Sequence, residues 1–565
     1  MSNMSDPRRI VICCDGTWQS SVTWRENIPS NVTKLCRVIA RDGTDPTDRN
    51  KVWQQIVYYD SGIGTGSLSW WEKVRQGGVG DGLTENVIEA YNFIVNNYKA
   101  GDEIFCFGFS RGAYTARAVA GLVSDFGVIK PQHMQLFPEL YRAYKSPNCG
   151  DPLVNGQRTT FKMQDCQVWQ SFVNQNMVQT NGNSEDSRLE VPNSNKVKIV
   201  GVWDTVGSLG VPDLKWKNNS NFREKYAFHN VKLSTNIEHA FHALALDERR
   251  KAFGPTLWYI PHKDIKEIKD EHKLPELKQV WFPGVHINIG GGSDDGLNSM
   301  KGDLEAMANI SFAWMLQCIS SYLTIDVQAY EKYMDYYFNW TKKIKYECTH
   351  HTTTVTEKAW SWVPYIPVIN PGEDELKAPK QDKKHEHLDL ERGWGLGPFV
   401  DSCNGLLYGY VGGVSRTPGE CTIEKVQDDG KLKTTPITDL GVTHEYIHPV
   451  ANYRQVWREN IKEPSTAPPK QLENFRRELS KGRYWWTKKT DGKVSLPEWM
   501  ILGNGGYNFE REYYKRALAA RLEDKDKELK KEGKSWSESD FLGKLDDDVN
   551  FKLVTEHKGC AFHYP

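Results

Sequence analysis

The sequence predicts an α/β fold with a mostly parallel sheet and helices on both faces. Short apolar segments alternate with amphipathic, helix-like segments from residue 9 to about residue 126, and such alternation is typical of parallel sheets. The stretch Ile104–Phe107 is apolar throughout, as a central strand covered on both faces would be. With 565 residues, 39% of them hydrophobic, the chain is long enough for two or three domains.

The first half of the alternation is the most regular. Residues 9–14 predict a strand. Residues 30–41 predict a helix, because Ser30 or Asn31 can cap its N-terminus and the apolar residues that follow recur at helical spacing. Residues 54–59 predict a second strand, and residues 82–98 predict an amphipathic helix.

The regular pattern stops after residue 130. Residues 131–193 are polar and predict an insertion over the sheet. Beyond them we expect a strand at 196–203, a helix at 233–246, an apolar segment at 278–282 and a helix at 303–322. The charged, apolar-poor stretch 372–392 predicts a mobile surface loop, and 518–549 predicts a solvated helix with a polar linker.

Residues 103–112, Glu-Ile-Phe-Cys-Phe-Gly-Phe-Ser-Arg-Gly, place the pattern Gly-x-Ser-x-Gly directly after a strand. A strand that reverses into a helix within so tight a turn leaves its serine strained at the tip, and it needs small residues two positions to either side. Gly108 and Gly112 flank Ser110 in this way, and an alanine-rich helical segment follows. The pattern predicts a nucleophile elbow and therefore an α/β-hydrolase-like fold. The alternative is an ordinary glycine-rich turn.

A serine hydroxyl is a weak nucleophile at neutral pH, so a base must take its proton and an acid must hold that base. In α/β-hydrolases an Asp or Glu and then a His follow the serine along the chain, on loops after the carboxyl ends of strands. Asp204 ends the strand at 196–203, and His286 follows the segment 278–282. We therefore predict Ser110, Asp204 and His286 as the catalytic residues, and we expect Gly290–Gly292 to let the imidazole move.

Hydrolysis also needs two hydrogen-bond donors for the developing oxyanion. One is expected to be the backbone N–H of Arg111, which follows the serine. The other is expected from the loop after the first strand, where Gly16 and Thr17 are the candidate donors. The alternative for this loop is a simple turn.

Other readings of these residues stay open. Asp204 could be a structural Asp that caps a turn, and His286 could be a core or loop histidine. His448 is the strongest rival base. A metal site at His239 and His242 stays open, although the chain lacks the His-Glu-x-x-His arrangement of zinc hydrolases. Asp294 and Asp295 could replace Asp204 only if the chain order were broken.

Composition narrows the function classes. The chain has 72 basic and 73 acidic residues, so its net charge of −1 gives no general electrostatic reason to expect nucleic-acid binding. Its 11 cysteines are scattered and odd in number, which favours a reducing compartment over a disulfide framework. The polar amino terminus predicts no signal peptide, and no uncharged apolar run reaches the roughly 18 residues of a membrane span. We therefore expect a cytoplasmic protein.

Six motifs in one order resemble a known family. They are Cys14–Trp18, Gly62–Thr65, Gly108–Arg117, Val202–Gly207, Ala243–Arg249 and Trp281–His286. Together they resemble the largely uncharacterised α/β-hydrolase domains that include the catalytic domain of bacterial type VI secretion phospholipase effectors, over roughly residues 8–320. The chain departs from the family at one place, reading His-Ile-Asn-Ile-Gly-Gly from His286 where relatives tend to read His-Ser-Asp-Val-Gly-Gly.

The resemblance implies Ser110 as nucleophile, Asp204 as acid and His286 as base, and glycerophospholipid as the substrate class. We predict a serine hydrolase of carboxylic esters, with phospholipid or other acyl lipid esters as substrates, an acyl-enzyme intermediate and no cofactor. A small-ester or peptidase-type hydrolase and a non-catalytic scaffold are the alternatives. The oligomeric state stays open.

We divide the chain into a catalytic domain at 1–320 and a mixed, aromatic-rich C-terminal covering or lid region at 321–565. The tryptophan-rich stretches 67–71, 359–365 and 484–486 are candidates for a lid or for a surface that contacts a membrane peripherally.

Overall fold

The structure is a computed structural model. It describes residues 7–16, 29–44, 52–61, 79–144, 191–206, 231–250, 253–268, 270, 273–292, 305–346, 349–350, 386–387, 392–397, 413–426, 432–460, 470–490, 492–501 and 506–531.

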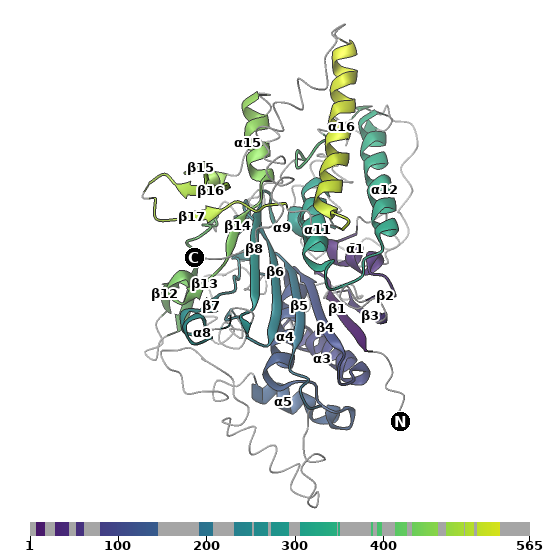
Figure 1. Cartoon of the computed structure of the whole chain (residues 1–565), viewed down its shortest axis with the longest axis vertical. Coiled ribbons are helices and arrows are strands. Elements are labelled where there is room, and N and C mark those ends of the chain that lie inside the picture. Colours follow the sequence, from purple (N-terminus) through teal and green to yellow (C-terminus); the bar gives the residue numbers. More distant parts are fainter. Residues whose placement is uncertain are drawn as a thin grey trace, which may run out of the picture.

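An eight-stranded sheet forms the centre of the molecule, with strand order β14-β8-β6-β5-β4-β1-β3-β2 (Figure 1). Its strands are β1 (Arg8–Cys14), β2 (Asp42–Thr44), β3 (Val52–Asp60), β4 (Glu103–Phe109), β5 (Val197–Trp203), β6 (Ile237–Ala245), β8 (Glu276–Phe282) and β14 (Glu445–Ile447). All neighbouring strands are parallel except β2, which pairs antiparallel with β3. The predicted α/β fold with a mostly parallel sheet is confirmed.

Helices cover the sheet on both faces because successive side chains of a strand point to opposite sides. Ile10 and Ile12 of β1 pack with α3 (Val79–Asn97) and α4 (Ser110–Phe126). Val11 and Cys13, which alternate with them, pack with α1 (Asn31–Val38) and α11 (Glu305–Ile319). The helices at 30–41, 82–98 and 303–322 were therefore predicted correctly, with small differences at their ends.

The predicted helix at 233–246 is wrong, because this segment contains strand β6, paired with β5 on one side and β8 on the other. Residues Ala240–Ala245 are buried on both faces, so the sequence lacks the apolar–polar alternation that marks a half-exposed strand. Its alanines and leucines also favour helix in isolation. Pairing within the sheet overrides that local preference.

The C-terminal half adds to this core. It contributes α12 (Val327–Tyr346), the edge strand β14, α15 (Val450–Asn460) and α16 (Phe509–Lys531), and Figure 1 shows α16 standing beside α12. A small sheet of β15 (Phe475–Ser480), β16 (Arg483–Lys488) and β17 (Ser495–Pro497) continues from β14 through a bridge between Ile447 and Glu498. The strands β11 (Thr422–Val426) and β12 (Leu432–Pro436) form a hairpin. The short strands β7 (Ile260–Pro261) and β13 (Gly441–Val442), which are far apart in the sequence, form a separate antiparallel pair.

Several predicted segments fall partly or wholly outside the described residues. Of the insertion 131–193, the structure describes a 3-10 turn at Pro131–Leu136, α5 (Phe137–Tyr144) and residues 191–193. Phe137 stacks on Tyr91 of α3 at 4.5 Å between ring centroids. Of the loop 372–392, only residues 386–387 and 392 are described, and residues 532–549 are outside. The division near residue 320 stays a prediction.

The order of the strands places a topological switch point between β1 and β4. From β1 the chain continues to β3 on one side, whereas from β4 it continues to β5 on the other. In open α/β sheets the loops diverge at such a switch point, and ligands bind there at the carboxyl ends of the strands. Gly16 follows β1 and Ser110 follows β4, so both lie at this point.

Among the described residues, no helix combines the length and the apolar character that crossing a membrane requires.

A buried ion pair ties α1 to α11. Lys34 Nζ lies 2.7 Å from Glu305 Oε2, and the two side chains are 1% and 2% exposed. We expect Lys34→Met to lower the free energy of unfolding by about 3–5 kcal/mol, because it leaves the Glu305 carboxylate buried without its cation. Urea unfolding should show this. The double variant Lys34→Met/Glu305→Met should recover most of the loss.

The exposed pair Lys530–Asp526 provides the control, with side chains 72% and 40% exposed. Lys530→Met should change stability by no more than about 0.5 kcal/mol. An equal effect of the two lysine substitutions would contradict the role assigned to the buried pair.

Candidate active site

The turn from β4 into α4 is strained and tightly packed, as a nucleophile elbow requires. Ser110 adopts a φ of 58°, a left-handed conformation that residues with side chains rarely adopt. A Cβ on Gly108 would lie 2.3 Å from the carbonyl oxygen of Gly112, and a Cβ on Gly112 would lie 2.1 Å from the carbonyl oxygen of Cys14. Glycine is therefore required at both positions, because the first turn of α4 packs against Gly108 on one side and against the end of β1 on the other.

The structure brings the three predicted catalytic residues together. His286 Nε2 lies 2.8 Å from Ser110 Oγ, and His286 Nδ1 lies 2.6 Å from Asp204 Oδ2. The three side chains come from the carboxyl ends of β4, β5 and β8 and are 7%, 0% and 6% exposed in the order Ser110, Asp204, His286. Both ring nitrogens of His286 are thus within hydrogen-bond distance of a partner, one of the Asp204 carboxylate and the other of the Ser110 hydroxyl.

Asp204 is held by its own backbone as well as by its partners. It has a φ of 40°, and its N–H donates to the carbonyl of Ala243 at 2.7 Å. Its Oδ1 accepts the N–H of Ala245 at 3.0 Å, so the end of β6 fixes the carboxylate.

Arg416 completes the surroundings of Asp204, and sequence reasoning missed it. Its Nη1 donates to Asp204 Oδ1 at 2.6 Å and its Nη2 to Oδ2 at 3.0 Å. Burial by itself would raise the pKa of Asp204, but Arg416 and the His286 hydrogen bond hold that pKa well below its usual range. The carboxylate is therefore ionised at neutral pH. No sequence signal pointed to Arg416, because it lies 212 positions after Asp204.

Burial lowers the pKa of His286, and the Asp204 carboxylate opposes this effect only in part. The rings of Phe109 and Phe253 flank the imidazole, with centroids at 4.7 and 4.8 Å. The backbone N–H of His286 donates to Glu248 Oε2 at 3.2 Å, and Glu248 in turn forms an ion pair with Arg250. Glu248 also escaped sequence reasoning as a site residue, although it lies in the family-like motif Ala243–Arg249.

Gly290, the first of the three glycines expected to let the imidazole move, has a packing role in the structure, and the expected movement stays a prediction. His286 begins the short helix α9 (His286–Gly290), and a Cβ on Gly290 would lie 2.1 Å from the Phe109 ring. Gly290 thus allows close packing beside the elbow. Asn288, at the position where relatives tend to have Asp, accepts the N–H of Val285 at 3.0 Å and so caps α9.

The predicted oxyanion donors are only partly described. Arg111 lies in the first turn of α4, where backbone N–H groups have no partner within the helix. The Gly16 N–H donates to Asp15 Oδ1 at 2.7 Å, and Thr17 is outside the described residues. Asp15 also accepts hydrogen bonds from Ser30, Thr33 and Tyr59, which fix the loop after β1.

The rival residues have other partners. On strand β6, His239 and His242 are three positions apart and point to opposite faces of the sheet, so they cannot share a metal ion. His242 instead accepts the N–H of Thr205 at 3.1 Å and so supports the loop of Asp204, and burial lowers its pKa to about 3. His448 Nε2 lies 3.1 Å from Glu510 Oε1. Asp294 and Asp295 are outside the described residues.

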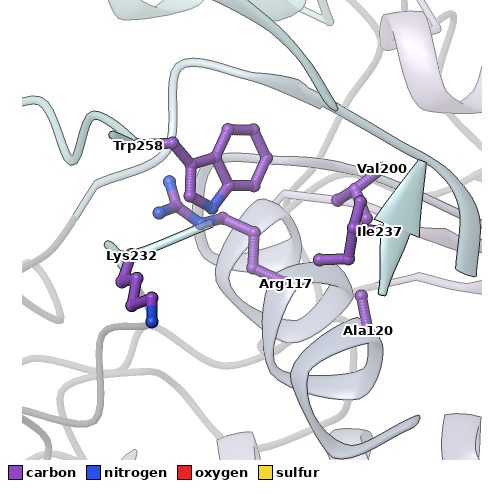
Figure 2. A pocket seen from close by; sticks show the side chains of 6 residues that line it. All are labelled: Arg117, Ala120, Val200, Lys232, Ile237 and Trp258. Carbon is purple, nitrogen blue, oxygen red and sulfur yellow. The ribbon is translucent and has the colours of Figure 1, made fainter. Parts of the chain in front are cut away.

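Two further features bear on where ligands could bind. A cavity beside α4 is lined by Arg117, Ala120, Val200, Lys232, Ile237 and Trp258, and Figure 2 shows the Arg117 side chain reaching toward the indole of Trp258. Its volume of about 10 Å³ has room for at most one water molecule. The guanidinium of Arg117 already lies 4.0 Å from the Trp258 ring and donates to the carbonyl of Thr256 at 2.5 Å. This cavity is therefore a detail of packing.

Of the three tryptophan-rich stretches, only 484–486 lies within the described residues. Trp486 is 1% exposed, and its indole donates to Glu498 at 2.9 Å, so it packs inside the small sheet.

The chain is similar to several known proteins over part of its length. A yeast relative, the uncharacterized protein YEL023C of Saccharomyces cerevisiae, is 24% identical over 283 residues, which are 46% of this chain and 34% of the relative. The chain therefore spans only about a third of that relative's length.

Two solved structures are similar over part of the chain. One is an uncharacterized protein from Pseudomonas aeruginosa, with 15% identity, a TM-score of 0.28 and coverage of 56% of this chain and 46% of the other. The other is the Tle1 effector bound to the VgrG spike of the type 6 secretion system, with 18% identity, a TM-score of 0.25 and coverage of 51% and 52%.

The family assignment rests on a match to a family model. The model describes the catalytic domain of Tle1-like phospholipase effectors of the type VI secretion system (T6SS), and it matches residues 8–318, more than half of the chain. The protein belongs to the family of Tle1-like phospholipase effector catalytic domains.

Proposed function

We propose that this protein is a serine hydrolase that cleaves carboxylic esters of lipids, phospholipids foremost, through an acyl-enzyme intermediate. The observation that carries the proposal is the hydrogen bond of 2.8 Å between Ser110 Oγ and His286 Nε2, with His286 Nδ1 bound to an ionised Asp204. Membership of a phospholipase family supports lipid esters as the substrate class. The expected location, cytoplasmic with peripheral association to a membrane surface, belongs to this proposal.

The reaction follows from the order of these contacts. His286 Nε2 accepts the hydroxyl proton as Ser110 Oγ attacks the ester carbonyl carbon, and Asp204 stabilises the imidazolium that forms. The tetrahedral intermediate collapses when the C–O bond to the alcohol breaks, and the alcohol takes the proton from His286. Water then hydrolyses the acyl-enzyme by the same steps.

The oxyanion of each tetrahedral intermediate would be bound by backbone N–H groups, those of Arg111 and of Gly16 or Thr17. Since the Gly16 N–H donates to Asp15, its part in this proposal requires the amide to be shared with the substrate oxygen.

Ser110→Ala should lower kcat for phosphatidylcholine and for p-nitrophenyl butyrate by roughly 10³-fold or more, because the residues of such a triad act as a unit. A fluorophosphonate probe should label the native protein and not the variant. Ser124→Ala is the matched control, because Ser124 is a buried serine on the same helix whose hydroxyl donates to the carbonyl of Gly121. Full activity of Ser110→Ala would refute the proposal, and the lack of probe labelling of the native protein would favour a scaffold.

The pH profile tests the base. His286 must be neutral to accept a proton, and burial lowers its pKa, so the neutral form should persist below pH 6.5. We expect kcat/KM to be constant from neutral pH down to that value and to fall only at lower pH. The measurement is kcat/KM for a soluble ester over pH 4–8. An acid limb with its midpoint above 6.5 would contradict this assignment.

We further propose that the Arg111 side chain, next to Ser110 in the sequence, binds the phosphate of a phospholipid substrate. Its Nη1 is buried without a hydrogen-bond partner among the described residues, and burial lowers the pKa of its guanidinium to about 10, so the group stays charged at neutral pH. Arginine binds phosphate through paired, charge-assisted hydrogen bonds.

Arg111→Met should therefore lower kcat/KM about ten-fold more for phosphatidylcholine than for p-nitrophenyl butyrate. Parallel assays of the two substrates measure this ratio, with the exposed Arg476→Met as control. An equal loss on both substrates would argue against phosphate recognition by Arg111.

A further inference from the structure

The segment 413–418 reaches the site through one side chain. Val414 is 57% exposed, whereas Arg416, two positions later, is 5% exposed. The backbone of the segment is anchored beside the motif after β6, where the Val414 N–H donates to the carbonyl of Arg249 at 2.8 Å. Arg416 is thus directed inward from a segment whose neighbouring residues largely face solvent.

Arg416 makes four hydrogen bonds at the base of the site. Two go to the two oxygens of Asp204, and two go to the carbonyls of Ala245 and Phe253, each at 2.7 Å. Ala245 also donates its N–H to Asp204, and the ring of Phe253 lies against His286. One guanidinium therefore fixes the acid and the two backbone segments that border the acid and the base.

We propose that Arg416 is a positioning residue of the hydrolase centre, which holds the Asp204 carboxylate by a two-pronged ion pair and keeps the Asp204–His286 pair free of an extra proton at neutral pH. This inference rests on the proposed function. It also extends the site beyond residues 8–318, the part of the chain that matches the family model.

The electrostatic part of this role has a definite sign. The charged groups that face His286 within the described residues are Asp204, Glu248 and Arg250, and Arg416 acts on it through Asp204. The neutral His242 is near Asp204 and interacts electrostatically with it and with Arg117 and Arg416. If the Arg416 cation is removed, a proton on either Asp204 or His286 becomes more favourable. The pH at which the pair takes up its proton must then rise, whichever residue carries the proton.

The test compares Arg416→Gln and Arg416→Lys with the native chain, in the pH profile of kcat/KM for p-nitrophenyl butyrate. Arg416→Gln should move the midpoint of the acid limb up by about one pH unit or more. It should also lower kcat about 10²-fold, because the carboxylate loses its fixed position. Arg416→Lys keeps the charge but not the two-pronged geometry, so its midpoint should stay near the native value while kcat remains reduced.

Arg392→Gln provides the matched structural control. Arg392 is 3% exposed and donates through Nε to the fully buried Asp524 at 3.0 Å, so this variant also breaks a buried Arg–Asp pair of the C-terminal half. It should lower the melting temperature and leave the midpoint of the acid limb unchanged. A purely structural role of Arg416 would give the same result.

The outcomes separate the two proposals. An unchanged midpoint in Arg416→Gln, with Ser110→Ala inactive, would overturn the role of Arg416 and leave the proposed function intact. Full activity of Ser110→Ala would overturn the proposed function itself. If Arg416→Gln does not fold, Arg416→Lys provides the test. A shift of about one pH unit in the midpoint of its acid limb, despite the retained positive charge, would overturn the inference.

Discussion

The candidate site depends on one constraint: the Asp204 carboxylate must stay ionised although it is fully buried. Asp204 is 0% exposed, and an isolated buried carboxylate would be neutral. Arg416, His286 and the N–H of Ala245 together keep it ionised. A protonated, neutral Asp204 could not stabilise the imidazolium of His286. The function of His286 as a base therefore depends on the groups that keep the Asp204 carboxylate ionised.

Backbone geometry adds a second requirement. Ser110 and Asp204, at the ends of neighbouring strands, both have positive φ values, of 58° and 40°. Such conformations cost about 1–3 kcal/mol each and persist only where the surroundings fix them. The buried sheet fixes both, since Gly112 packs on the backbone of Cys14 and the Asp204 N–H binds Ala243. The apolar core thus maintains two strained turns whose side chains meet at His286.

The sequence alone predicted those features of the fold and the site that depend on residues close together in the chain. The strand–helix alternation predicted the parallel sheet, and the spacing of Gly108, Ser110 and Gly112 predicted a tight, strained turn, because each depends on neighbouring residues. Chain order then singled out Asp204 and His286. The prediction failed at β6, where burial on both faces removes the period of two and only pairing with β5 and β8 decides the structure. Arg416 could not be found, because its contact with Asp204 depends on how a distant segment folds back.

The same long-range dependence makes the C-terminal half part of the core and not only a cover. Helix α11 has apolar residues all around it, and all of its residues but Gln317 are buried. A helix of that kind needs partners on every side. The sheet and α9 supply some of them, and α12 and α16 supply others, with Phe509, Tyr513 and Ala517 of α16 in the same apolar cluster as Phe312 of α11. Residues 8–318 alone would expose that surface and would lack both β14 and Arg416. The part of the chain that the family model matches is therefore incomplete, both as a folded core and as a site.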